Sequence, residues 1–253
     1  MKICYLILLF FLAVSVFAEQ RKWNTLSGKT ITAEYVTVMG KKVILKTKTN
    51  QVIRLPFAKL SKQDQEYIEL KNPPRLKIQL SKTTKQRIFP QNIYEDERPK
   101  AQYATFFVKI KQISTHNYPH KMTAEYFAIG KEINGSKKIL LGRGKYMFKL
   151  NGYGSTFSRQ GITFELPKYH LKVKNAKRAE DEEWLPFRGI RYSGYIIVVK
   201  DKTGKIIAYK TTSKRYFLYL KNLQKLYQGV FFDPKTGKRT TPTRPPHFPV
   251  LYQ

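Results

Sequence analysis

Histidine is the side chain in this sequence best suited to metal binding or proton transfer, and two of the four histidines lie four residues apart. His116 and His120 would share one face of a helix at that spacing, but Pro119 stands between them and disfavours the helix. The one cysteine, Cys4, lies in an N-terminal segment that we expect to be removed, and no acidic ligand lies near the two histidines in the sequence. We therefore expect no metal site and no cofactor.

Two further motifs suggest a ligand but lack the spacing that it requires. Glu180-Asp181-Glu182-Glu183 could attract a cation, yet consecutive side chains point in different directions and the glycine of a calcium loop is missing. Gly142-Arg143-Gly144-Lys145 resembles a phosphate loop without the helix that should follow, and we interpret it as a β-turn. No nucleophile and base can be paired from known motifs. The sequence favours a protein without catalytic activity, with a hydrolase whose site joins distant residues as the alternative.

Positive charge is the strongest feature of the composition. The chain has 48 Lys and Arg against 17 Asp and Glu, which gives a formal net charge of +31. The excess is spread along the chain, and a field of this size favours anionic partners such as acidic glycans, lipid headgroups or nucleic acid. In the other interpretation, lysines that alternate with apolar residues are simply the solvated faces of strands. The composition leaves both interpretations open.

Residues 1–18 have the three parts of a secretory signal peptide. Lys2 provides the positive start, Ile3–Leu12 are apolar, and Val16-Phe17-Ala18 places small residues before a cleavage point at Glu19. The apolar stretch is shorter than the ~20 residues of a membrane-spanning helix. We therefore predict an exported protein, periplasmic, envelope-associated or extracellular, without an integral membrane span once the signal is removed; an uncleaved anchor is the alternative.

The elements that would position any binding residues begin with a small module over residues 19–72. Polar and apolar residues alternate there in short segments, which is typical of antiparallel strands. Strands are expected at Lys29–Val38, Lys42–Thr47 and Val52–Leu55, with turns at Met39–Lys41 and Lys48–Asn50. Asn50 is suited to the left-handed backbone that the second turn needs.

A short helix is expected to complete this module. Ser61 has the character of an N-cap and Asp64 follows it near the helix N-terminus. The helix should span Lys62–Leu70 with Tyr67 and Leu70 facing inward. Pro73-Pro74 then ends it and forms a linker.

The order of short motifs in this module resembles a known family. The motifs are Arg21-x-Trp23, Gly28-Lys29, Ala33-Glu34-Tyr35-Val36, Val43-x-Leu45, Leu55-Pro56, Lys59-Leu60-Ser61 and Asp64-Gln65-x-Tyr67-Ile68. This set is similar to the Sla-type homology domain, a small SH3-like β-barrel known from a eukaryotic endocytic adaptor and from exported bacterial proteins. The chain departs from the family at a hairpin, where Thr49-Asn50 stands in place of the common Asp-Gly, and it has one extra residue near Lys41.

The resemblance implies a fold and a general kind of function. In the adaptor the domain binds a short Asn-Pro-Phe-type peptide, so the resemblance implies a protein or peptide partner. Lys46, Lys48 and Arg54 are the basic residues that would line an equivalent groove in this chain. Exposed strand lysines without a ligand are the alternative, because a shared fold does not fix a ligand.

A second module, residues 75–228, contains many short β segments. They are Arg75–Leu80, Ala101–Ile113, Thr123–Ile129, Lys138–Leu141, Tyr146–Leu150 and Ile162–Leu166. The clearest is a hairpin over Tyr195–Tyr209, whose turn Asp201-Lys202-Thr203-Gly204 has glycine where positive φ is needed. Seven or more short strands with close turns predict an antiparallel sandwich of immunoglobulin or fibronectin type.

Three segments interrupt this β pattern. Asn175–Glu183 is polar and is expected to form a loop or short helix. Ser213–Tyr227 carries Tyr216, Leu220, Leu223 and Tyr227 at helical spacing, which predicts one amphipathic helix capped by Ser213. Residues 229–253 are rich in proline and are expected to form an extended tail.

Together these features predict a mainly β protein, with an SH3-like small barrel followed by a β-sandwich and one short C-terminal helix. The leading functional hypothesis is an exported, non-catalytic binding or structural protein of the cell envelope. A polyanion-binding protein is the alternative that the charge suggests.

Overall fold

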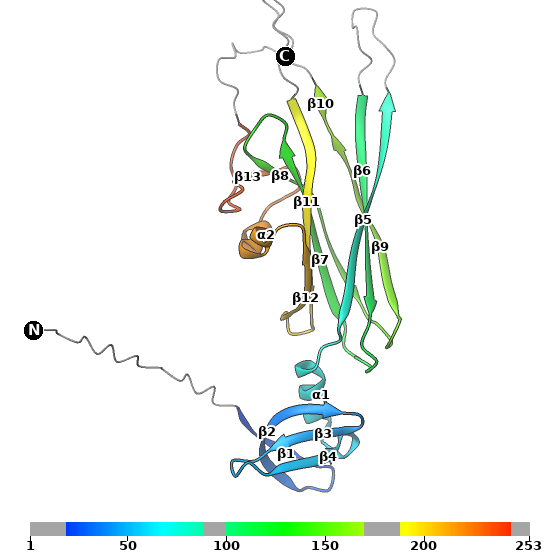
Figure 1. Ribbon diagram of the computed structural model, residues 1–253, viewed down its shortest axis with the longest axis vertical. Helices are drawn as coiled ribbons and strands as arrows, with labels where there is room; N and C mark the ends of the chain where they lie inside the picture. Colours follow the sequence, from blue (N-terminus) through cyan, green and yellow to red (C-terminus); the bar gives the residue numbers. More distant parts are fainter. Residues whose placement is uncertain (1–18, 89–99, 170–187, 244–253) are drawn as a thin grey trace, which may run out of the picture. The chain divides into compact units, whose positions relative to one another are not determined.

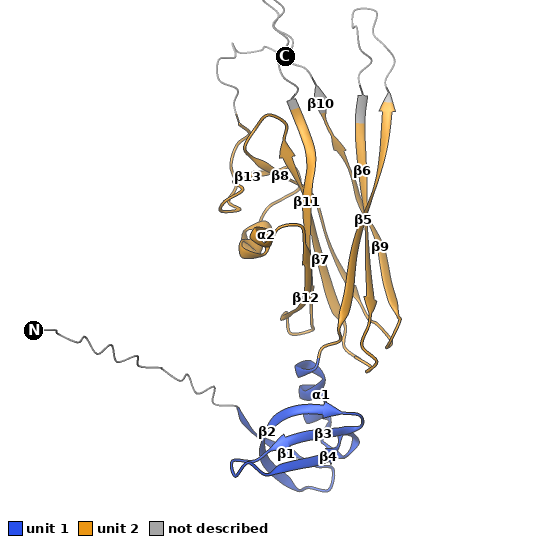
Figure 2. Cartoon of the chain, in the orientation of Figure 1, with its two compact units in different colours: residues 1–72 blue, residues 73–253 orange. Residues whose placement is uncertain are grey.

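The computed structural model describes residues 19–88, 100–169 and 188–243. The chain forms two compact units, residues 1–72 and 73–253 (Figure 2), and each is described by itself. The predicted signal peptide and the acidic segment Asn175–Glu183 lie outside the described residues. Within those residues, no helix has both the length and the apolar character needed to cross a membrane.

The first unit is a four-stranded antiparallel sheet with one helix (Figure 1). Its elements are β1 (Gln20–Asn24), β2 (Thr30–Met39), β3 (Lys42–Lys46), β4 (Val52–Pro56), a 3-10 turn (Phe57–Lys59) and α1 (Lys62–Lys71). The strands pair in chain order, because each is joined to the next by a short turn. Asn50 takes φ 63° in the second of these turns, as predicted. The chain is SH3-like in this unit, as the sequence predicted; β1 was not among the expected strands.

The core of the first unit is centred on Trp23. Its side chain is fully buried, and its indole Nε1 donates a 2.8 Å hydrogen bond to the carbonyl oxygen of Ala33. From α1, Asp64 and Ile68 are buried, one helical turn apart on one face. Tyr67 faces inward as predicted, since it packs against this core with its ring 5.7 Å from that of Trp23, whereas the half-buried Leu70 does not contribute to the core. Apolar periodicity could not identify the buried position that a carboxylate occupies.

The second unit is a sandwich of two antiparallel sheets (Figure 1). The smaller sheet has the order β5-β6-β9, with strands β5 (Leu76–Ile88), β6 (Lys100–Gln112) and β9 (Thr156–Leu166). The larger sheet contains β7 (Met122–Glu132), β8 (Lys138–Phe148), β10 (Lys168–Tyr169), β11 (Arg188–Lys200), β12 (Ile206–Thr211) and β13 (Phe231–Phe232). The predicted mainly β architecture is confirmed.

The larger sheet is buried on both faces. Toward the smaller sheet it presents residues such as Tyr126, Ile197 and Val199, which pack against Val108 and Ile110 of β6. Its opposite face is covered by the segment after β12, through buried side chains that include Tyr216, Tyr219, Leu220, Leu223, Leu226 and Phe232. The continuous apolar run in β11, Tyr195–Val199, follows from this double burial.

Strand β8 corrects one expectation for the second unit. The sequence predicted two strands separated by a turn at Gly142–Lys145, but β8 runs through these residues without interruption. Gly144 is required here because a Cβ at this position would lie 2.3 Å from Cε1 of Tyr126 on the neighbouring strand. Arg143 donates hydrogen bonds from Nη1 to the carbonyl oxygens of Gln224 (3.0 Å) and Leu226 (2.8 Å). Gly144 therefore allows close packing, and neither Gly142 nor Gly144 forms a turn.

The predicted amphipathic helix is two short helices, α2 (Lys214–Leu218) and α3 (Leu220–Leu223). The chain leaves helical geometry at Tyr219, and Ser213 makes no capping hydrogen bond through its side chain. Tyr227 is 77% exposed, contrary to its predicted place in the apolar stripe. The prediction of one continuous helix was therefore wrong, although the apolar residues before Tyr227 do face the sheet.

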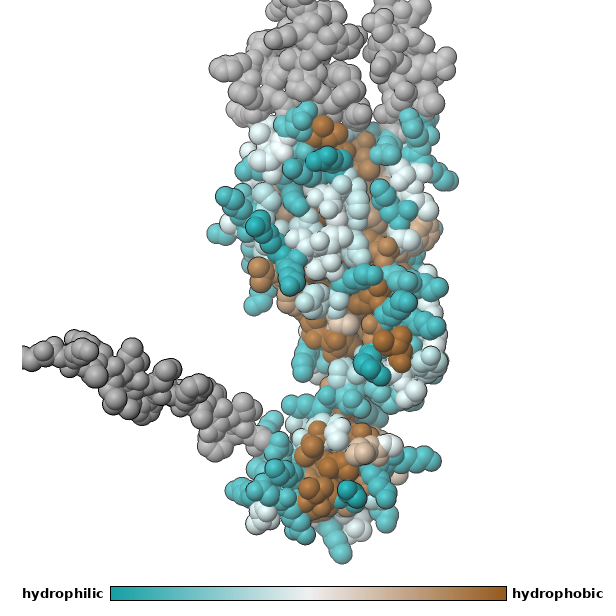
Figure 3. Space-filling view, in the orientation of Figure 1, coloured by the Kyte–Doolittle hydropathy of each residue, from teal (hydrophilic) through white to brown (hydrophobic). Residues whose placement is uncertain are grey.

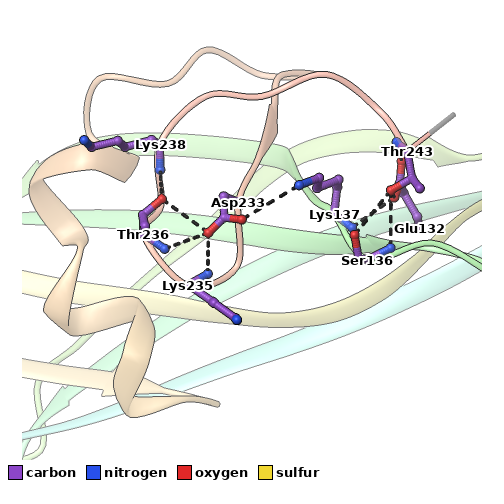
Figure 4. Close-up of polar contacts among 8 residues, drawn as sticks. All are labelled: Glu132, Ser136, Lys137, Asp233, Lys235, Thr236, Lys238 and Thr243. Carbon is purple, nitrogen blue, oxygen red and sulfur yellow. Dashed lines mark hydrogen bonds and ion pairs between the residues drawn. The ribbon is translucent and has the colours of Figure 1, made fainter.

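The expected extended tail is also wrong for residues 229–243. Phe232 is fully buried and belongs to β13, which pairs with β8. Asp233 closes a turn by accepting hydrogen bonds from the backbone N–H groups of Lys235 (2.8 Å) and Thr236 (3.0 Å) (Figure 4). Hydrophobic pairing with the sheet edge outweighs the local proline content in this part of the segment. Residues 244–253 lie outside the described part of the chain.

Glu132, at the end of β7, fixes the far end of this segment. Its carboxylate accepts hydrogen bonds from the backbone N–H of Thr243 (2.7 Å), from the Thr243 hydroxyl (2.6 Å) and from the backbone N–H of Lys137 (2.9 Å) (Figure 4). Glu132 is only 8% exposed, so these bonds replace most of its hydration. The segment is thus held at both β13 and Thr243.

Candidate functional site

The outward face of the first unit's sheet carries apolar residues where polar ones would be expected. Strand pairing places Ile44 opposite Arg54, and Lys46 opposite Val52. Residues directly opposite each other lie on the same face of a sheet. The alternate residues of β3, Val43 and Leu45, are fully buried in the core. The face away from the core therefore combines exposed Val52 and Arg54 with Lys46, which lies opposite Glu34 of β2, and with Ile44, which is only 9% exposed.

A β-bulge in β2 adds a third apolar residue to this face. The register shifts between Tyr35 and Thr37, so that Thr37 lies opposite Ile44 and Val36 is the extra residue. Val36 is 49% exposed and Val52 is 55% exposed. We call Val36, Ile44, Val52, Lys46 and Arg54 the outer strip. Figure 3 shows apolar side chains gathered among hydrophilic ones on one face of the first unit.

The structure places two of the three predicted site residues in the outer strip. Lys46 is half-buried at the end of β3 and Arg54 is exposed in β4. Lys48 is exposed in the turn after β3, outside the strand ladder. Sequence reasoning missed the exposed Val36 and Val52 as binding candidates. Their signal was present, because they are apolar residues at positions where strand alternation predicts contact with solvent.

The outer strip has the chemistry of a peptide-binding surface. Partly exposed valines offer apolar contact, and Arg54 can bind a carboxylate with two parallel hydrogen bonds. Strand β4 is also at one edge of the sheet, since its pairing partner within the sheet is β3 alone. An edge strand can accept an extended peptide as an additional strand. The strip thus provides both side-chain contacts and an adjacent sheet edge.

A polar cluster behind the sheet keeps this module folded. The Asp64 carboxylate accepts hydrogen bonds from Arg21 Nη2 (2.9 Å), from the Asn24 backbone N–H (2.8 Å) and from the Ser61 hydroxyl (2.9 Å). The Arg21 guanidinium lies 4.1 Å from the centre of the Tyr67 ring, a favourable cation–π distance. Ser61 also caps α1, as predicted, by accepting from the Asp64 backbone N–H. Because the chain's own groups occupy this carboxylate, we assign it a structural role.

The predicted weak candidates for metal binding do not form a site in the described residues. The carbonyl oxygen of His116 accepts a 2.6 Å hydrogen bond from Gln112 Nε2, and the His120 ring lies edge-on to Tyr118. Within residues 19–88, 100–169 and 188–243, no three His, Cys, Asp or Glu side chains are grouped so that they could hold a metal ion.

One carboxylate of the second unit joins the sheet to the helical segment. Glu125 of β7 forms a 3.1 Å ion pair with Lys200 and accepts a 2.6 Å hydrogen bond from Gln224 Nε2. Burial acts to raise the pKa of Glu125, but the hydrogen bonds from Gln224 and Lys200 outweigh it and lower that pKa below the ordinary value. The charged form of Glu125 is therefore the form that stabilises the fold.

Comparison with known proteins identifies the first unit. Residues 16–74 match the family model of SLA1 homology domain 1, SHD1, which confirms the resemblance found in the sequence. A solved structure from Akkermansia muciniphila is similar over 56% of this chain and 73% of its own, with 13% identity and a TM-score of 0.24, too low to establish a common fold. No curated protein matches the chain. The family match supports a binding or structural domain at residues 16–74.

Proposed function

We propose that the protein is exported and acts as a non-catalytic binding or structural protein of the cell envelope. In this proposal the outer strip of the first unit holds a protein or peptide partner. The observation that carries it is the combination of the SHD1 match at residues 16–74 with partly exposed Val36 and Val52 beside Lys46 and Arg54. Single exposed valines are common, but a strip of them along neighbouring strands is typical of an interaction surface.

The strip favours a partner with apolar and acidic groups in an extended segment. Side chains at alternate positions of a β-strand point to the same face, so such a segment could place two apolar side chains against Val36 and Val52. An acidic residue of the same segment would meet Arg54, which is exposed and can bind a carboxylate bidentately. The proposal therefore assigns apolar contact to the valines and orientation to the cations.

A pair of charge-introducing substitutions tests the binding part. V36D/V52D should abolish recovery of the partner when purified protein is used to capture proteins from an envelope extract, because two carboxylates would replace the apolar contacts. L26D is the matched control, since Leu26 is 71% exposed and lies between β1 and β2, outside the strip. Recovery of the same partner by V36D/V52D and by the unmodified protein would refute the role of the strip.

The export part rests on the signal-peptide pattern of residues 1–18 and is tested separately. Export with cleavage should give a protein whose N-terminal residue is Glu19, determined by sequencing material from the envelope or medium. A protein that remains in the cytosol with Met1 intact would contradict export. That outcome would leave the binding experiment on the outer strip unaffected.

A further inference from the structure

The two outer faces of the sandwich differ in what covers them. On the larger sheet, the segment that contains α2 lies over the outward face (Figure 1). Side chains of α2, α3 and β13 bury Phe127 and Val198 there. On the smaller sheet, β5-β6-β9, outward side chains near the starts of β5 and β9 are exposed, including Lys77, Gln79 and Ser158. The smaller sheet therefore presents a broad face to solvent.

Lysines and uncharged polar groups dominate this face. Strand pairing sets Lys77 opposite Lys111, and places Lys109 between Gln79 and Ser158. In the next row along the strands, Phe107 of the central strand β6 is half-buried. We call this surface the lysine face and define it by Lys77, Gln79, Phe107, Lys109, Lys111 and Ser158.

The three lysines are close enough to act as one cationic site. Directly opposite residues in an antiparallel pair have Cβ atoms ~5 Å apart, and like charges at such positions are destabilising. Lys109 lies two residues from Lys111 on the same strand, about 7 Å along it. These spacings are within the Debye length of ~8 Å at physiological salt, so the three charges reinforce one another. The protein thus maintains an unfavourable grouping of charge on rigid strands.

The described carboxylates of the second unit do not neutralise this grouping. Glu165 of β9 is on the same face, but it lies opposite Tyr103, six residues along β6 from Lys109, a distance of about 20 Å. Among the described residues of the second unit, Glu125 pairs with Lys200, and Glu132 binds the segment that ends at Thr243. Asp201 and Asp233 accept backbone hydrogen bonds in their own turns. Within the same described residues, none of the ion pairs involves Lys77, Lys109 or Lys111. As far as the described residues go, the charge of the lysine face is therefore available to an external anion.

We propose that the lysine face binds an acidic polysaccharide. The lysines complement its carboxylates or sulfates, and the amide and hydroxyl of Gln79 and Ser158 can hydrogen-bond to its sugar hydroxyls. The Phe107 ring offers an apolar surface to a sugar ring. Neutral hydrogen-bonding groups beside the cations suit a polymer with free hydroxyls on every sugar better than DNA, whose backbone sugars have no free hydroxyls. This proposal goes beyond the proposed function, which concerns the first unit.

Fluorescence anisotropy with a labelled oligogalacturonate, which has one carboxylate per sugar, tests the proposal. At physiological salt we expect K77Q/K109Q/K111Q to lower the affinity of the purified protein about tenfold or more, because three lysine–carboxylate contacts are removed from one site. K205Q/K210Q/K221Q is the matched control: it removes the same charge from exposed positions outside the lysine face. It should lower the affinity less than about threefold, through the general field alone.

Each alternative outcome overturns the proposal in a different way. Equal losses of affinity in the two triple variants would show that the net charge of the protein attracts the polymer and that no specific site exists. Absence of binding by the unmodified protein would refute the surface itself. Tighter binding to an oligothymidylate of equal charge, lost in K77Q/K109Q/K111Q, would assign the face to nucleic acid. Circular dichroism spectra and thermal unfolding of both triple variants must match the unmodified protein, which exposed Lys→Gln changes should permit.

Discussion

Replacing Asp64 with alanine removes the side chain that joins α1 to β1 in the first unit. Its carboxylate accepts two hydrogen bonds from the Arg21 guanidinium (2.9 and 3.2 Å), one from the Asn24 backbone N–H and one from the Ser61 hydroxyl. Alanine can make none of them. Arg21 and the Asn24 N–H would lose their partners inside a small domain.

The expected loss of stability is large compared with the stability of such a domain. Removing one partner of a buried ion pair costs ~3–5 kcal/mol, and because the Arg21 side chain is 28% exposed, water can partly replace the carboxylate. The unpaired Asn24 N–H keeps the total near the middle of that range, about 4 kcal/mol. A domain of roughly fifty residues has a total stability of about 3–8 kcal/mol. Asp64→Ala should therefore unfold the first unit or bring it close to unfolding.

Trp23 reports this change directly because it is fully buried beside the cluster. The chain has two tryptophans, so the measurement is made in a Trp184→Phe background, where emission comes from Trp23 alone. Asp64→Ala should shift the emission to the red and lower the urea midpoint sharply. Asp64→Asn keeps a hydrogen-bond acceptor but loses the charge, so its urea midpoint should fall between those of Asp64→Ala and the parent. An Asp64→Ala protein with the parent's urea midpoint would refute the structural role of the cluster.

Three further predictions concern the second unit. Gly161→Ala places a Cβ 2.4 Å from the Tyr126 hydroxyl and should destabilise the second unit by ~1–3 kcal/mol, measured by urea unfolding. The loss should be smaller in a Tyr126→Phe background, and equal losses in both backgrounds would contradict the clash. Glu132→Ala should release the segment near Thr243 and speed trypsin cleavage within it, and an unchanged digestion pattern would count against the clamp. Because its pKa is lowered in the folded protein, the ionised Glu125 stabilises the fold at pH values above its unfolded-state pKa. Glu125→Gln should therefore lower the free energy of unfolding by about 1 kcal/mol at pH 7, and this difference from the parent should disappear as the pH falls below the lowered pKa. A difference in unfolding free energy that persists at low pH would refute the assignment.

The alternation of polar and apolar residues predicted strand positions correctly where a strand has one solvent-exposed and one buried face. Lys42–Thr47 and Val52–Leu55 were predicted within a residue or two of β3 and β4, since each has a single core face. The turn at Asp201–Gly204 was equally clear, because Gly204 has φ 87° and only a few residues tolerate such a backbone. At these positions the local sequence was enough to predict the backbone structure.

The errors arose where a distant segment decides the local structure. Gly142 and Gly144 were predicted to form a turn because the local sequence does not reveal the Tyr126 ring, which needs the space at Gly144. The proline-rich segment after Gly229 was expected to be extended, yet pairing of β13 with β8 and the burial of Phe232 hold its first part against the sheet. In the outer strip, Lys46 and Arg54 were found from charge, but the β-bulge that brings Val36 to the same face depends on strand register.

The packing of Phe232 has a consequence for the order in which the protein matures. The first unit is built from contacts within residues 19–72, so it can form as soon as that stretch has been synthesised. The larger sheet of the second unit lacks part of its covering layer until Phe232 and Thr243 are in place. Until then Phe127 and Ile129 have an incomplete apolar cover, which chaperones can bind on the growing chain. Early completion of one unit and late completion of the other are thus set by where the covering residues lie in the sequence.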